Sequence, residues 1–340
     1  MSGPEISDPN DLARPERCAH DAKPRRLCDV CEAAGRTFLA CSLACLDHHL
    51  SAEHAESAPS TSAERAHGYA SALNRRFPDS WAGYAEHRQH VLNLIAGLPR
   101  GAELCVLGAG NCNDLELEQL SAWFSQIHLA DLDAEALERA RDRQSTAVRA
   151  KLHLHGELDF SGLIEHLDAW GEQFPERAEL GRAALMAAQG IVQSLGQNFP
   201  AVVSTCVLSQ LATPFQRSWI TSRSNWGDLL RAINAVHLAT LAGATRSGGH
   251  GLLIFDTASS KETPALGALQ GKASEQLAAF VDEALNDGSL YLKHQPQQLL
   301  AQLSSPGLNS MVADARIGAP WLWRLGQDTQ LVYSLQFNHP

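Results

Sequence analysis

The chain has 340 residues, 44% of them hydrophobic, which gives room for two globular domains, one with a sizeable core. The formal net charge of −11 and the absence of any cluster of five or more Lys/Arg residues argue against nucleic-acid or anionic-membrane binding. The polar start of the chain contains no signal-peptide core, and no apolar run reaches about 18 residues. We therefore expect a cytoplasmic protein without a membrane span.

Cysteines and histidines are concentrated near the N-terminus. Five of the eight cysteines lie between Cys18 and Cys45. In a cytosolic chain, this spacing indicates metal ligands rather than disulfides. The candidate ligands are Cys18, His20, Cys28, Cys31, Cys41, Cys45, His49 and His54, with His48 as an alternative to His49. Eight ligands can hold two zinc ions. The alternatives are one ion held by the four cysteines of 28–45, or no metal.

The sequence Cys41-Ser-Leu-Ala-Cys45, followed by two histidines, resembles MYND-type and HIT-type zinc fingers. That resemblance implies interleaved sites, one formed by Cys18, His20, Cys41 and Cys45, the other by Cys28, Cys31, His49 and His54. The pair Cys18-x-His20 departs from the pattern, because one residue separates the ligands instead of two. Acidic and basic residues balance over 14–54, which favours recognition of a protein or peptide over phosphate backbones. We assign residues 14–56 to a zinc-finger module and 57–66 to a linker.

The remaining residues, 67–340, alternate short apolar runs with helical patterns, which indicates an α/β fold with a parallel sheet. We expect helices over 65–95, 114–124, 134–144, most of 160–197, and 226–241. The last of these should stop at Ser247-Gly-Gly249. We expect strands over 104–107, 127–130, 151–155, 201–205 and 251–255, and a closing antiparallel hairpin of 321–325 and 330–337.

A glycine turn follows the first of these strands. Gly108, Gly110 and Asn111 lie in it, and glycines let backbone N–H groups approach a ligand. Asp131 follows Gly108 by 23 positions, the spacing of a ribose-binding acid, with Asp133 as a competitor. We expect a nucleotide pocket here, with Asn111, Asn113 and Asp114 capping the next helix.

These motifs, with the terminal hairpin, resemble class I S-adenosylmethionine (SAM) methyltransferases, whose Rossmann-like sheet ends in a reversed strand. The resemblance implies that Asp131 holds the ribose and that Asp159 and Phe160 receive adenine, with Glu157 as an alternative acid. It also implies that the segment 202–211, which contains Cys206, lies along the cofactor. Cys112 stands where the family has its third glycine, and Cys105 or Val106 replaces the usual acid of the first strand. NAD(P) is the runner-up, although position 113 is Asn rather than Gly.

Residues on the acceptor side are expected at the carboxyl ends of the strands. Asp256 is the candidate catalytic residue, with a solvated or capping acid as the alternative. Tyr84 and Arg88 are candidates for the methionine carboxylate, unless their helix only packs on the sheet. Ser209 and Gln210 either line the cofactor or start a helix, and His237 is expected to be a buried core residue. Trp321 and Trp323 share one face of the hairpin, as core or as a cleft wall.

We therefore expect a SAM-dependent methyltransferase that acts on a protein, peptide or small-molecule acceptor. The zinc finger would recognise the substrate or a partner protein. The alternative is a non-catalytic interaction or regulatory protein with a degenerate methyltransferase fold, with Cys112 as a mark of drift.

Overall fold

The computed structural model describes residues 80–217, 223–272 and 274–340 continuously. Among the first 79 residues it describes only 16–17, 26–27, 31, 38–40, 49, 53, 64, 67–68, 71 and 74–75. Three short strands in this part, β1 (Glu16–Arg17), β2 (Arg26–Leu27) and β3 (Phe38–Ala40), form a sheet in the order β1-β3-β2. The predicted linker 57–66 lies outside the described residues except for Glu64. Within the described ranges, no helix is long and apolar enough to cross a membrane.

One eight-stranded sheet forms the centre of the large domain. Its strands are β4 (Glu103–Leu107), β5 (Gln126–Ala130), β6 (Leu152–His155), β7 (Phe199–Thr205), β8 (Thr245–Ser259), β9 (Ala313–Ile317), β10 (Trp321–Leu325) and β11 (Asp328–Asn338). The strand order is β10-β11-β8-β7-β4-β5-β6, with β9 also paired to β11. Strands β6, β5, β4, β7 and β8 are parallel, and β11 is antiparallel to β8, β9 and β10. The predicted parallel, Rossmann-like sheet with a closing hairpin is confirmed.

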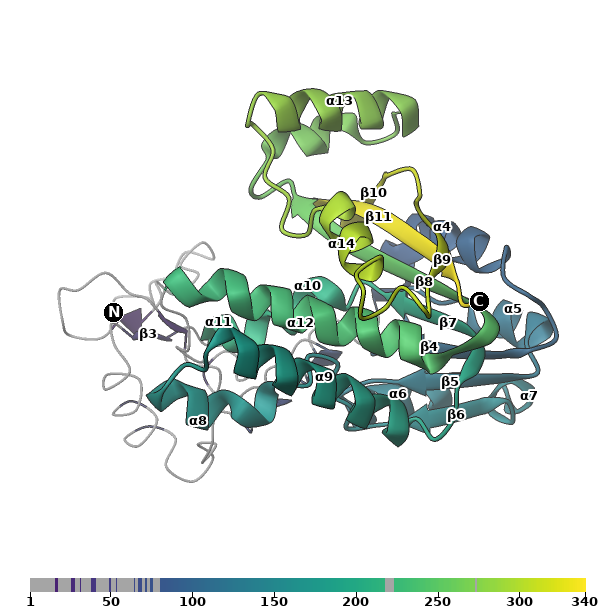
Figure 1. The fold of residues 1–340 in the computed structure, drawn as a ribbon. Helices are drawn as coiled ribbons and strands as arrows, with labels where there is room; N and C mark the ends of the chain where they lie inside the picture. The colour runs from purple at the N-terminus through teal and green to yellow at the C-terminus, as the bar shows by residue number, and fades with distance from the viewer. Residues whose placement is uncertain are drawn as a thin grey trace, which may run out of the picture.

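Helices connect the parallel strands and cover the sheet (Figure 1). They are η1 (Ser80–Tyr84), α4 (Ala85–Ile95), α5 (Leu117–Trp123), α6 (Ala134–Asp142), α7 (Thr146–Arg149), η2 (Ile164–His166), α8 (Leu167–Glu172), α9 (Arg177–Ser194), α10 (Leu208–Leu211), α11 (Thr213–Arg217), α12 (Arg223–Ala244), η3 (Pro264–Leu269), α13 (Ser274–Asn286) and α14 (Pro296–Leu303). The long helices α9 and α12 run side by side, while α13 projects from the end of the molecule near β10 and β11 (Figure 1).

The core lies on both faces of the sheet because the central strands are apolar on both sides. On one face, Cys105 and Leu107 of β4 pack with residues of α9 and α12. On the other face, Leu104 and Val106 pack with residues of α4, α5 and α6. Every residue of β7 is buried. The sheet is thus a rigid frame whose loops at the carboxyl ends of the strands are available for a site.

Two of the expected boundaries are wrong. The helix expected over 114–124 begins at Leu117, its N-cap is Glu116, and no side chain caps it, so Asn111, Asn113 and Asp114 are not its caps. Ser247-Gly-Gly249 does not stop a helix, because α12 ends at Ala244 and these residues already belong to β8. A Cβ at Gly249 would lie 2.7 Å from the Arg246 carbonyl oxygen and 2.9 Å from that of Pro200, so the glycine permits close strand pairing.

Strand β9 has no counterpart among the expected elements. Its residues alternate between partly buried and exposed, and it pairs only at the outer edge of β11. The sequence Ala-Asp-Ala-Arg-Ile carries a weak apolar pattern, so its strand conformation depends on the edge that β11 provides.

Candidate functional site

The turn after β4 has the tight geometry that its glycines allow. Gly108 and Gly110 have φ values of +74° and +47°. A Cβ on Gly108 would lie 2.4 Å from Cβ of Val207, so no side chain fits there. Cys112, at the third glycine position, takes φ +53° and is buried, so it adopts the left-handed backbone that a glycine would adopt more easily.

The backbone N–H groups of this turn bond within the protein. Those of Gly108 and Ala109 donate to the Ala130 carbonyl oxygen, at 2.8 and 3.1 Å. That of Gly110 donates to Oδ2 of Asp131 at 2.8 Å. The N–H groups of Gly108 and Gly110 therefore have acceptors within the protein. Gly110 thereby holds the Asp131 carboxylate in place, and Gly108 ties the turn to the end of β5.

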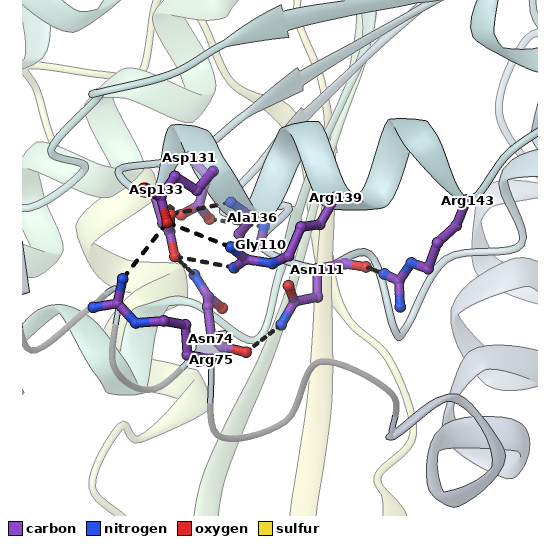
Figure 2. A network of polar contacts seen from close by, with 10 residues as sticks. Asn74, Arg75, Gly110, Asn111, Asp131, Asp133, Ala136, Arg139 and Arg143 are labelled. Atoms are coloured by element: carbon purple, nitrogen blue, oxygen red, sulfur yellow. Dashed lines mark hydrogen bonds and ion pairs between the residues drawn. The ribbon is translucent and has the colours of Figure 1, made fainter. Parts of the chain in front are cut away.

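Asp131 and Asp133 lie close together at the end of β5 but differ in role (Figure 2). Asp131 is buried, and its Oδ1 accepts the backbone N–H of Asp133 at 2.9 Å. Burial raises the pKa of Asp131 to about 6, against the lowering effect of its hydrogen bonds. The Asp133 side chain instead caps α6 by accepting the N–H of Ala136 at 3.0 Å. Of the two competing acids, Asp131 lines the cavity described below and Asp133 does not.

Asn111 and Asn74 lie on the other side of this network (Figure 2). Nδ2 of Asn111 donates to the Asn74 carbonyl oxygen at 2.7 Å, and Nδ2 of Asn74 donates to Oδ2 of Asp133 at 3.2 Å. The orientation of the Asn111 amide is thereby fixed. Its Oδ1 is buried and accepts no hydrogen bond from the residues that the structure describes, so it is available to a donor on a ligand.

A cavity of about 530 Å³ opens at the carboxyl ends of β4, β5, β7 and β8. It brings together residues from segments far apart in the chain. Its lining includes these predicted residues: Tyr84, Gly108, Gly110, Asn111, Asp131, Asp159, Phe160, Cys206, Ser209, Gln210, Asp256 and Trp323. Such a position, beyond the carboxyl ends of parallel strands, is where open α/β sheets bind ligands.

One end of the cavity is formed by the loop after β6. Phe160 is buried, and Leu158 lines the cavity beside it. The carboxylate of Asp159 accepts the N–H groups of Ser161 and Ile164, at 2.8 and 3.0 Å, and the Ser161 hydroxyl at 2.6 Å. Asp159 therefore shapes its own loop, while the alternative acid, Glu157, is exposed and absent from the lining.

The other end of the cavity holds Asp256, where β8 passes the loop after β7. The Ser209 hydroxyl donates to Asp256 Oδ1 at 2.6 Å. Burial raises the pKa of Asp256, while the Ser209 hydrogen bond and the charge of Lys293 lower it. Asp256 is thus a buried carboxyl group in the cavity wall, with a raised pKa and a hydroxyl donor beside it.

A buried histidine supports the adjacent wall. His87 on α4 is fully buried, and its Nδ1 accepts the indole N–H of Trp321 at 3.2 Å. Its Nε2 lies 3.7 Å from the Cys206 sulfur, and its ring stacks on Trp323 with the centroids 4.3 Å apart. Burial lowers the pKa of His87 to about 3, so the ring is neutral and rigidly placed. The sequence reasoning missed His87, although it lies one helical turn from Tyr84 and Val91.

Asp114 is a second residue whose place the sequence reasoning missed. It lines the cavity, and burial raises its pKa to about 6. The sequence signal was present, since an acid directly after a glycine turn faces the same cavity as the turn. The sequence analysis assigned Asp114 to capping the next helix instead.

Arg88 is absent from the cavity lining. Its guanidinium forms an ion pair with Glu116 at 2.6 Å and donates to the carbonyl oxygens of Trp81 and Asn113 at 2.8 and 2.9 Å. It also lies over the Trp81 ring, 3.5 Å from the centroid. Arg88 therefore ties α4 to the loop between β4 and α5. His237 is buried as expected, with its Nε2 2.7 Å from the Ser204 hydroxyl.

Only two of the candidate zinc ligands fall among the described residues. The Cys31 sulfur lies 3.3 Å from Nε2 of His49, and the His49 ring stacks on Phe38 with the centroids 3.6 Å apart. Cys18, His20, Cys28, Cys41, Cys45, His48 and His54 lie outside the described residues. Within the described part of the chain, no group of three or more His, Cys, Asp or Glu side chains is arranged to hold a metal ion.

No protein-family model matches this sequence, and no curated protein matches it significantly. Among solved structures it is similar to the YcgJ protein of Bacillus subtilis, with 11% identity, a TM-score of 0.40, and coverage of 75% of this chain and 99% of that one. It is also similar to magnesium protoporphyrin IX methyltransferase of Synechocystis, solved with bound S-adenosylhomocysteine (SAH). The identity is 11%, the TM-score is 0.36, and the match covers 76% of this chain and 84% of that one. A third similar structure is a glycopeptide N-methyltransferase complexed with sinefungin. The identity is 13%, the TM-score is 0.36, and the match covers 76% of this chain and 94% of that one. At these scores the likeness adds nothing to what the sheet itself shows.

Proposed function

We propose that the chain is a SAM-dependent methyltransferase. The observation that carries this proposal is the joint placement of Asp131 and the glycine turn in one cavity, beside a sheet closed by an antiparallel strand. A dinucleotide-binding sheet would instead continue with parallel strands, in the order 3-2-1-4-5-6. Here β11 runs antiparallel beside β8.

The residues of the cavity fit SAM by the chemistry of its parts. The carboxylate of Asp131 accepts one N–H on each oxygen and retains acceptor capacity for two ribose hydroxyls. The free Oδ1 of Asn111 and the carboxyl group of Asp114 suit the ammonium group of the methionine end. Leu158 and Phe160 offer apolar surface to adenine, which makes an adenine-specific contact by Asp159 unnecessary.

When bound, SAM supplies an electrophilic methyl group whose bond to sulfur breaks as the acceptor atom bonds to carbon. The protein aligns the two reactants, as in-line displacement requires. Asp256 takes the proton that the acceptor loses, and Ser209 holds its carboxylate. Tyr84, Cys206 and Trp323 form the wall that excludes water, with His87 behind them. Arg88 holds the glycine loop rather than the methionine carboxylate.

The proposal is tested with two aspartates of the same loop. We expect Asp131→Asn to weaken SAH binding at least about tenfold, because hydrogen bonds to a charged group contribute about 1.5–3 kcal/mol. Asp133→Asn is the matched control, since asparagine also caps helices, and its affinity should stay at the wild-type value. Titration calorimetry measures both. Unchanged binding by Asp131→Asn would overturn the proposed cofactor site and favour a non-catalytic protein with a degenerate fold.

We further propose that residues 14–56 bind zinc and recognise a protein or peptide. The separation of 3.3 Å between the Cys31 sulfur and Nε2 of His49 supports this. With Zn–S near 2.3 Å and Zn–N near 2.1 Å, both atoms can ligate one tetrahedral ion. The stacked Phe38 ring fixes the orientation of His49. Of the two adjacent histidines, His49 is therefore our proposed ligand.

Metal analysis of the purified full-length protein tests this assignment. We expect one or two zinc ions per chain, loss of one ion in His49→Ala, and no loss in His48→Ala. Zinc loss in His48→Ala with retention in His49→Ala would reverse the assignment. A wild-type protein that binds no zinc would refute the module.

A further inference from the structure

Asn74 lines the cofactor cavity but belongs to none of the motifs that predicted the cavity. The residue precedes η1, outside the strands of the large domain, and it shares the cavity wall with Gly110 and Asp131. It is partly buried. The cofactor contacts proposed above do not account for its place in this wall.

Asn74 is held against the turn after β4 and the start of α6 by polar contacts (Figure 2). Its carbonyl oxygen accepts Nδ2 of Asn111 at 2.7 Å, which ties its backbone to the glycine turn. Its own Nδ2 donates to Oδ2 of Asp133 at 3.2 Å, which ties its side chain to the residue that caps α6. The adjacent Arg75 adds an exposed ion pair with Glu135 at 3.5 Å. Both the backbone and the amide of Asn74 are thereby fixed.

These contacts decide which way the amide of Asn74 points. A carboxylate only accepts hydrogen bonds, so the amide nitrogen faces Asp133 and the amide oxygen faces away from it. A Cβ on Gly110 would lie 3.0 Å from this oxygen and 3.8 Å from Oδ2 of Asp131. Among the described residues, none donates a hydrogen bond to Asn74 Oδ1. Two acceptor oxygens therefore flank one point of the cavity wall, which Gly110 leaves open because it has no side chain.

The ligand that suits this point is one that brings hydroxyl donors. Oδ2 of Asp131 already accepts the Gly110 N–H at 2.8 Å and has capacity for a further donor, and Oδ1 of Asn74 has two lone pairs. A ribose carries two hydroxyl groups on adjacent carbons, so one edge of the sugar can donate to both residues at once. A phosphate group on that edge would instead bring negative charge against the carboxylate.

We propose that Asn74 is a cofactor-binding residue, whose Oδ1 accepts one ribose hydroxyl while Asp131 accepts the other. This inference rests on the proposed function, because SAM supplies the ribose. Asp131 forms the stronger hydrogen bond, since its carboxylate is charged, and Asn74 adds a neutral one. Asn111 is a positioning residue for this contact, because it anchors the backbone next to the amide.

The amide of Asn74 also explains why Asp133→Asn should retain its affinity for SAH. The new amide at position 133 can donate to Asn74 Oδ1, and the Asn74 amide then turns over. Its nitrogen takes the place of Oδ1 beside Gly110 and donates to the hydroxyl oxygen, which can accept as well as donate. Removal of the Asn74 amide, in contrast, leaves no partner for this hydroxyl.

The test is calorimetric titration of the full-length chain with SAH and with its 2′-deoxy and 3′-deoxy analogues, in wild type and two variants. We expect Asn74→Ala to weaken SAH binding about three- to tenfold, the contribution of one neutral hydrogen bond. The analogue that lacks the hydroxyl bound by Asn74 should bind wild type and Asn74→Ala equally, while the other analogue keeps the full difference. Arg75→Ala is the matched control, since it loses only the exposed ion pair, and it should bind SAH as wild type does.

The outcomes separate this contact from the cofactor itself. A wild-type protein that binds no SAH would overturn the proposed function, and this inference with it. SAH binding by wild type and Asn74→Ala at the same affinity would overturn only the contact of Asn74. An equal loss in Asn74→Ala for SAH and for both analogues would also overturn the contact, because Asn74 would then only shape the cavity.

A melting temperature of Asn74→Ala within about 2 °C of wild type, without ligand, shows that the fold is retained. If the variant fails this criterion, a crystal structure of the wild-type chain with SAH decides. A ribose hydroxyl oxygen within about 3.0 Å of Asn74 Oδ1 is the expected result. A ribose whose two hydroxyls both lie beyond hydrogen-bond distance of that oxygen would overturn the contact.

Discussion

At the scale of single residues, the surroundings of each carboxylate decide what it does. Asp133 caps a helix, and Asp159 organises its own loop through three donors. Asp131 and Asp256 also accept hydrogen bonds, but these two have raised pKa values, caused mainly by burial. The sequence contains these four acids with little to separate them, because burial and donor geometry arise only from the fold.

The pair of Ser209 and Asp256 gives a prediction about pH. The Ser209 hydrogen bond lowers the pKa of Asp256, so Ser209→Ala should raise it and move the acidic limb of the rate profile to higher pH. Ser209→Thr keeps a hydroxyl and should leave the limb in place. The measurement is transfer of a tritiated methyl group from SAM to acceptors in a fractionated cell extract. An unmoved limb in Ser209→Ala would show that Asp256 is not the proton acceptor.

At the scale of elements, the loop between β4 and α5 links the fold to the site. Its turn is held by backbone bonds to the end of β5, and Arg88 ties it to α4. The pattern of short apolar runs predicted the strands from β4 to β8 and the closing hairpin, since buried parallel strands are apolar throughout. It failed where strand formation depends on a neighbour, as in β9, and where glycines permit close pairing, as at Gly249 in β8.

Two glycines with similar backbones test the geometry of this loop. Gly108 has φ +74° and contacts Val207, whereas Gly196, at φ +77° after α9, has no neighbouring atom within 4 Å. Gly196→Ala should lower the free energy of unfolding by about 1–2 kcal/mol, the cost of a left-handed backbone alone. Gly108→Ala should cost more, because its Cβ also overlaps Val207. Denaturant unfolding measures the free energy of unfolding of both variants. Equal decreases in the two variants would contradict the close contact between Gly108 and Val207.

At the scale of the whole molecule, the sheet brings distant segments to one cavity. Tyr84, Asp131, Cys206 and Asp256 were proposed from separate motifs, and the order of the strands places them together. The wall formed by His87 and the two hairpin tryptophans joins residues more than 230 positions apart. No local sequence pattern contains that contact. The sequence alone therefore predicted the residues that line the cavity better than the residues that pack behind them.

The raised pKa of Asp131 predicts how ligand binding by the whole molecule responds to acid. Ribose hydroxyls bond to the carboxylate, so SAH affinity should fall as the pH drops below about 6. Protonation of Asp131 does not itself unfold the chain, because a carboxyl group with a raised pKa makes the folded chain more stable, relative to the unfolded one, as the pH falls from about 6 to 4. The lowered pKa values of the buried His87 and His237 act in the opposite direction, so a melting curve at each pH is the control for unfolding. Calorimetry from pH 8 to 5 measures the effect. Asp114→Asn should keep this dependence, and a flat profile in that variant would assign it to Asp114 instead.

The central claim is that the cavity holds SAM rather than a nicotinamide dinucleotide. Titration calorimetry of the full-length protein with SAH, and in parallel with NAD, tests it most directly. The arrangement of Asp131, Asn111 and the closing antiparallel strand predicts binding of SAH at micromolar concentration and no heat with NAD. Binding of NAD alone, or of neither ligand, would contradict the assignment of this cavity to methyl transfer.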